Sequence, residues 1–157
     1  MKNKKAFTLI ELLIVIAIIA ILAAIVYVAV DPARRMAESR NATRWSEVNS
    51  ILNAVLKYTS DNKGGLPANL AGAAANNYFV LGTSSTGCNL ECGAQITATA
   101  CLNLESNLVD NYISQIPTDP SSGTSLNTDY YIMRTANNRI TVGACDPERS
   151  AVISVQR

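Results

Sequence analysis

Two sets of side chains in this sequence could do chemistry. Glu11 is a single carboxylate inside an otherwise apolar N-terminal stretch, where an unpaired charge is strongly disfavoured and seeks a cation. The second set is the four cysteines, Cys88, Cys92, Cys101 and Cys145, which could form disulfides or bind a metal ion. The 157 residues include no histidine, so the chain has no Ser-His-Asp or Cys-His catalytic group and no histidine metal ligand.

Composition narrows the function further. The chain is 48% hydrophobic and 16% charged, whereas a soluble domain usually carries roughly 25% charged residues. A formal net charge of +1 argues against a dedicated nucleic-acid-binding protein, which is normally strongly basic, so nucleic acid is not expected as a primary ligand. The sequence also shows no nucleophile–base pair, phosphate-binding loop or metal-ligand cluster. We therefore expect neither an enzyme nor a cofactor-binding protein.

The element that positions Glu11 is an apolar stretch. It begins at Phe7, and from residue 12 to residue 30 no side chain carries a charge or an amide. About 20 such residues span the hydrocarbon core of a bilayer. A cleaved secretory signal has a shorter apolar region of about 7–15 residues, followed by a small-x-small cleavage site that residues 28–32 match poorly. A plain signal anchor accounts for the apolar stretch and the lysines before it, but not for Glu11.

Residues 4–13, KKAFTLIELL, resemble the processing motif of the type IV pilins and of the pseudopilins of type II secretion systems. The resemblance implies that a prepilin peptidase cuts between Ala6 and Phe7, removing a leader of residues 1–6. Phe7 would then be the N-methylated first residue, and Glu11 would be the fifth residue, where the family keeps its glutamate. The family usually has glycine at the position of Ala6.

The resemblance also implies a role for Glu11 in assembly. If neighbouring subunits are staggered, its carboxylate can neutralise the Phe7 amine of the next subunit and so set their register. The alternative is that Glu11 only reaches the lipid headgroups, as long polar side chains near a helix end often do. The implied partners are other copies of the chain in a helical filament, the peptidase, and the assembly platform and motor machinery. The implied location is the cytoplasmic membrane, and then an extracellular pilus on the cell surface.

The pattern of the remaining residues fits an α+β fold, the pilin fold, in which one long N-terminal helix packs on a C-terminal antiparallel sheet. Residues 7–30 form its apolar membrane half, and residues 31–157 form the globular domain. Within that domain, residues 31–61 predict an amphipathic helix, with Pro32 kinking or breaking the helix near its start. The polar face of this helix, which includes Arg40, Arg44 and Glu47, is expected to be solvated.

Residues 62–128 predict a loop-rich segment with a short helix within residues 102–113. Residues 62–100, which are rich in glycine and small polar side chains, predict a connection with little core. Residues 129–157 contain three strand patterns, at 130–134, 139–144 and 151–155, and predict an antiparallel sheet of three or more strands.

The cysteines lie beyond the apolar stretch, in the part of the chain expected outside the cytoplasm. An even number in that compartment favours disulfides, and all three pairings remain open. A zinc site is less favoured, because the spacing lacks two C-x₂₋₄-C pairs. Asp119 and Asp129 could ligate calcium, but the regular carboxylate spacing of a calcium loop is missing, and we expect them to cap turns. No metal site is predicted.

These observations together predict a structural subunit of a type IV pilus-like filament. A pseudopilin of a type II secretion system is the nearest alternative. A minor, tip-located subunit that binds DNA or a surface is the third.

Overall fold

The computed structural model describes residues 7–93 and 95–157, and the chain divides into two compact units, Met1–Met36 and Ala37–Arg157. The expected leader, including Ala6 at the proposed cleavage site, lies outside the described residues. The element order is α1, α2, α3, β1, β2, β3, α4, β4, β5 and β6.

The first unit is built around helix α1, Leu9–Val30. The helix ends where Asp31 adopts a left-handed conformation with φ 43°. Asp31 Oδ1 then accepts a hydrogen bond of 3.2 Å from the backbone N–H of Arg34, and helix α2 begins at Pro32. The non-helical residue is therefore Asp31, while Pro32 stands at the first helical position, where a missing N–H leaves no partner unsatisfied.

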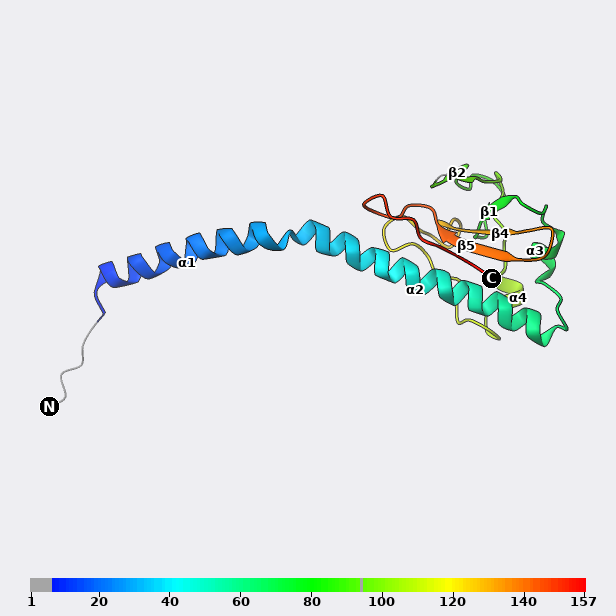
Figure 1. Cartoon of the computed structure of the whole chain (residues 1–157), viewed down its shortest axis with the longest axis horizontal. Coiled ribbons are helices and arrows are strands. Elements are labelled where there is room, and N and C mark those ends of the chain that lie inside the picture. Colours follow the sequence, from blue (N-terminus) through cyan, green and yellow to red (C-terminus); the bar gives the residue numbers. More distant parts are fainter. Residues whose placement is uncertain (1–6, 94) are drawn as a thin grey trace. The chain divides into compact units, whose positions relative to one another are not determined.

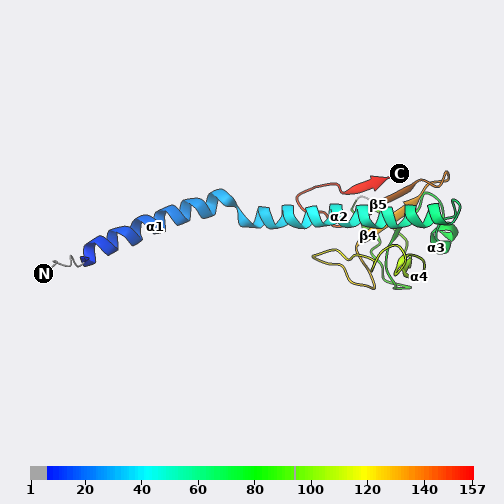
Figure 2. The same cartoon turned by 90° about the horizontal axis from the view of Figure 1, so that it is seen from below.

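The second unit is a sheet covered on one face by α2, Pro32–Asp61, from residue 37 onwards. The sheet order is β1-β4-β5-β6, with bounds Tyr78–Val80, Tyr130–Arg134, Ile140–Ala144 and Ser154–Gln156, and every neighbouring pair is antiparallel. Figures 1 and 2 show α2 running along the strands β4 and β5. The predicted antiparallel sheet of three or more strands is confirmed, with β1 as a fourth strand from a region expected to be loop.

Alternation along β4 gives the sheet two different faces. Tyr130 and Ile132 join the core beneath α2, which contains its buried apolar face at Val48, Ile51, Leu52 and Val55. Tyr131, one residue along, points to the other face and packs with Val80 and with Cys88, Cys92 and Cys145. Successive side chains of a strand point to opposite faces, so one strand contributes to both cores.

Residues 62–100 contain more core than the composition predicted. Leu70 and Leu81 are fully buried, so the expectation of little core there was wrong. Residues 62–128 form short elements rather than long ones: α3 Ala68–Gly72, β2 Glu91–Cys92, β3 Gln95–Ile96 and α4 Glu105–Leu108. The helix expected within residues 102–113 is limited to α4, because Val109 is extended and Asp110 takes φ 71°.

Candidate functional site

The N-terminal segment begins with a capping box, in which a hydroxyl and a carboxylate satisfy the free N–H groups of the first helical turn. The backbone N–H and the Oγ1 hydroxyl of Thr8 each donate to Oε2 of Glu11 over 2.8 Å, and Thr8 Oγ1 accepts from the Glu11 N–H at 3.3 Å. The sequence signal for this arrangement is Thr-x-x-Glu ahead of an apolar run, and the expectations drawn from the sequence did not include it. Glu11 therefore has a local partner within its own chain.

No residue of α1 is buried. The large apolar side chains from Phe7 to Val30 are 47–86% exposed. Among the described residues, one helix is long and apolar enough to cross a membrane, and it includes residues 9–30 of this stretch. A helix that is apolar on all sides needs a lipid or protein environment, because a soluble protein rarely exposes so large an apolar surface.

An ion cluster, which we call the Arg44 cluster, connects α2 to two distant loops and is fully buried at Arg44 and Asp119. It consists of Arg40, Asn41, Arg44, Asp119 and Glu148. Arg44 donates from Nε and Nη2 to the two carboxylate oxygens of Asp119 over 2.6 and 2.9 Å, and both side chains are fully buried. Arg44 Nη1 reaches Glu148 at 3.1 Å, and Arg40 holds the same carboxylate at 2.5 and 2.6 Å. The prediction that Arg44 lies on a solvated face was wrong.

Hydrogen bonding in the Arg44 cluster shifts the pKa values of its carboxyl groups. Burial raises the pKa of Asp119, but hydrogen bonds from Arg44 and Ser121 outweigh burial and lower it to about 2. Hydrogen bonds from Arg40 lower the pKa of Glu148 to about 2 as well. The pKa of Arg44 is raised by its hydrogen bond to Asp119. Both carboxyl groups therefore stay ionised in the folded chain at neutral pH.

The Asp119 pKa predicts a loss of stability in acid. The pKa of about 2 in the folded chain lies below the ordinary value of about 3.9, so the folded state binds the proton more weakly. The stabilisation is therefore complete above about pH 4 and is lost as the pH falls towards 2, by about 2–3 kcal/mol for this carboxyl group. Urea unfolding of the full chain in detergent at several pH values measures this slope. Asp119→Asn should flatten the slope, and an unchanged slope in that variant would contradict the assignment.

The cysteines form two disulfides, Cys88–Cys101 and Cys92–Cys145. All four are therefore bonded and none is free to bind zinc. The first disulfide closes a loop within the 62–128 segment, and the second joins β2 to the residue after β5. The segment is thereby held against the face of the sheet opposite α2.

The aspartates considered for calcium have protein partners. Asp119 is occupied by Arg44, and Asp129 accepts a hydrogen bond of 2.5 Å from the amide of Asn89. Burial raises the pKa of Asp129. Asp129 also takes φ 59°, a turn conformation that Asp tolerates, so this part of the expectation fits its geometry. Within the described residues, no group of three or more potential ligand side chains is placed to hold a metal ion.

A second polar contact under α2 was not foreseen. The hydroxyl of the buried Tyr130 donates to Glu47, and burial together with this carboxylate raises the pKa of Tyr130. Glu47 and Arg44 are three residues apart on α2, next to the apolar stripe of that helix. A polar residue bordering such a stripe is a candidate for burial, but the pattern does not identify its partner.

Comparison with known families identifies the N-terminal segment. Residues 1–27 match the family described as the prokaryotic N-terminal methylation motif, which confirms the resemblance seen in residues 4–13. This motif is the processing signal of type IV pilins and their relatives, which are structural proteins made as membrane-anchored precursors. Comparison with curated proteins and with solved structures gives no match.

Proposed function

We propose that this chain, which carries the N-terminal methylation motif of a pilin-like precursor, is a structural subunit of a type IV pilus-like filament. A prepilin peptidase removes residues 1–6 and Phe7 is N-methylated. The chain is stored in the cytoplasmic membrane. An assembly platform and motor then polymerise it into a fibre at the cell surface. The motif supports the processing step. The filament role is supported by the exposed apolar surface of α1.

The observation that carries the proposal is the complete exposure of α1, which has no buried residue. Lipid covers such a helix in the precursor. On polymerisation, the helices of neighbouring copies replace the lipid, so the apolar surface remains out of water throughout. The globular unit, stabilised by two disulfides, faces the oxidising exterior, where such bonds persist.

Glu11 has the capacity for two partners at once. Both hydrogen bonds from Thr8 end at Oε2. A carboxylate offers about four acceptor positions on its two oxygens, so Oε1 can still accept from a cation. In the filament, that cation is the Phe7 amine of an adjacent copy. The capping box holds the carboxylate in place for this contact rather than competing with it.

Three variants separate the cap from the charge. Glu11→Gln keeps a side chain that can complete a capping box but removes the charge, Glu11→Ala removes both, and Thr8→Ala removes the hydroxyl cap while keeping the charge. We expect E11Q and E11A to reduce the yield of sheared fibres at least tenfold, because an unpaired amine among apolar helices is costly. T8A should assemble, since a lost cap costs only about 1 kcal/mol.

Processing is measured in the same cells, by the intact mass of the chain after loss of residues 1–6. Normal fibre yield in E11Q would contradict the charge-pairing role. A wild-type chain that is processed and methylated but remains entirely in the membrane would contradict the filament role itself. Immunogold labelling should be distributed along the fibres, and labelling confined to fibre ends would indicate a tip subunit instead.

A further inference from the structure

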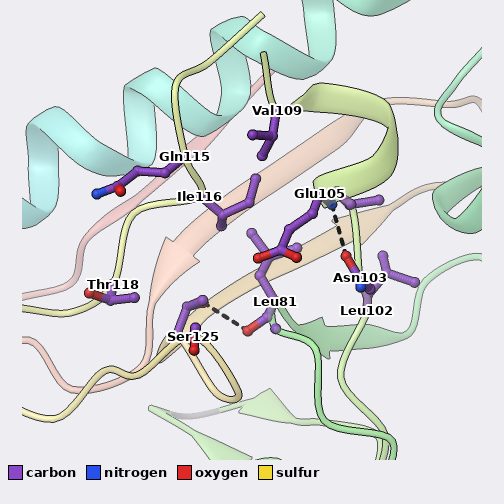
Figure 3. A pocket seen from close by; sticks show the side chains of 12 residues that line it. Leu81, Leu102, Asn103, Glu105, Val109, Gln115, Ile116, Thr118 and Ser125 are labelled. Atoms are coloured by element: carbon purple, nitrogen blue, oxygen red, sulfur yellow. Dashed lines mark hydrogen bonds between the residues drawn. The ribbon is translucent and has the colours of Figure 1, made fainter. Parts of the chain in front are cut away.

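The globular unit contains a cavity of about 490 Å³ that the proposed filament function does not use. It lies between α4, the end of β1 and the segment 115–128, and Figure 3 shows the side chains around it. Leu81, Leu102, Val109 and Ile116 supply its apolar surface. The volume is in the range of pockets that bind small organic ligands.

The charge in this cavity is a single carboxylate. Glu105 is the one ionisable residue in its lining, and it is exposed to solvent, while the other polar residues there are uncharged. Figure 3 shows the Glu105 side chain extending from α4 towards Leu81 and Ile116. Within the described part of the chain, the hydrogen bonds found at Glu105 are made by its backbone. Its N–H donates to Asn103 Oδ1 over 2.8 Å, and its carbonyl accepts from the Val109 N–H over 2.9 Å. The carboxylate itself has no protein donor there.

The walls around Glu105 are fixed by hydrogen bonds. Asn69 Nδ2 donates to the carbonyl of Asn103 over 2.7 Å, and Asn103 in turn accepts from the Glu105 N–H. On the opposite side, Thr128 donates from both its N–H and its Oγ1 to the carbonyl of Leu81, over 2.9 and 2.8 Å. The cavity is therefore preformed, which lowers the entropy cost of binding.

We propose that this cavity binds a primary alkylammonium group, with the ammonium at Glu105 and the alkyl stem against Leu81, Leu102 and Ile116. Apolar side chains next to one solvent-exposed carboxylate that has no protein donor favour an amphipathic cation. A neutral alcohol loses the ion pair, and an anion is repelled. The site does not depend on the proposed filament role, so an experiment can contradict either proposal without contradicting the other.

Two sources can supply this group: a free amine from solution, or a lysine of a second copy of the chain. Outside the expected leader, the sequence contains two lysines, Lys57 and Lys63. Both are exposed, one near the end of α2 and the other in the turn that follows it. Because two lysines could supply the group, the second source can be tested by replacing both of them.

The binding test uses the full chain, isotope-labelled in non-ionic detergent, titrated with n-butylammonium and followed by amide chemical shifts. We expect saturable shifts at residues 102–109 and 115–118. Glu105→Gln should weaken binding about tenfold, the effect of losing one charged hydrogen bond. Glu91→Gln, which removes an exposed carboxylate elsewhere on the same unit, is the matched control and should bind as the wild type does.

Equal affinity of E105Q and the wild type would overturn the proposal, as would equal affinity for n-butylammonium and 1-butanol. The source is resolved by carbodiimide coupling in a mixture of labelled and unlabelled chains. A mixed-isotope peptide joining Glu105 to Lys57 or Lys63 assigns the site to a second copy, and its loss in K57R/K63R is the control. Amine binding by the wild type without such a peptide assigns the site to a free amine.

Discussion

Replacing Arg44 with methionine should lower the free energy of unfolding by about 3–5 kcal/mol, a large part of the about 5–15 kcal/mol that stabilises a typical domain. The reason is the position of its partner. Asp119 is fully buried with both carboxylate oxygens bonded to Arg44, so removing the guanidinium leaves a buried, uncompensated charge. The measurement is denaturant unfolding of the full chain in detergent, followed by the fluorescence of Trp45, the single tryptophan.

The control is the double variant R44M/D119L, which removes both charges. Because two apolar side chains of similar size can replace a buried ion pair at little cost, this variant should recover most of the lost stability. R40M provides a second comparison, since Arg40 and Glu148 are both partly exposed and their pair should contribute less. If R44M and R40M lose the same small amount, the buried pair does not stabilise the fold as described.

The second large effect is expected from the disulfides, and the two should differ. Cys92–Cys145 spans a sequence separation of 53 residues and Cys88–Cys101 spans 13. In the chain-entropy account, closing the longer loop stabilises the folded state by about 4 kcal/mol and the shorter by about 3 kcal/mol. C92A/C145A should therefore lose more stability than C88A/C101A in the same unfolding experiment.

The longer disulfide also has the larger structural role, because it ties β2 to the end of β5 through two buried sulfurs. Its removal should release the 88–101 segment from the sheet, and amide hydrogen exchange should increase there while α2 stays protected. The reverse order of stabilities, or uniform exchange across the unit, would contradict this assignment.

Short-range signals in the sequence were sufficient for several elements. Residues 4–13 identify the processing motif because its residue types lie next to one another, and the motif match over residues 1–27 confirms it. The apolar stripe at Val48, Ile51, Leu52 and Val55 predicts α2 because neighbouring turns of one helix produce it. The strand patterns at 130–134 and 139–144 predict β4 and β5 in the same way, since alternation is a property of each strand alone.

The contacts that join these elements were decided by the tertiary structure. Nothing near Arg44 in sequence identifies Asp119 as its partner, and a polar residue on a helix is normally solvated. The same holds for the choice among three disulfide pairings, and for β1, whose three residues are too short for a clear pattern. Such features depend on which segments meet in space, whereas periodicity reports only which way a side chain faces within its own element.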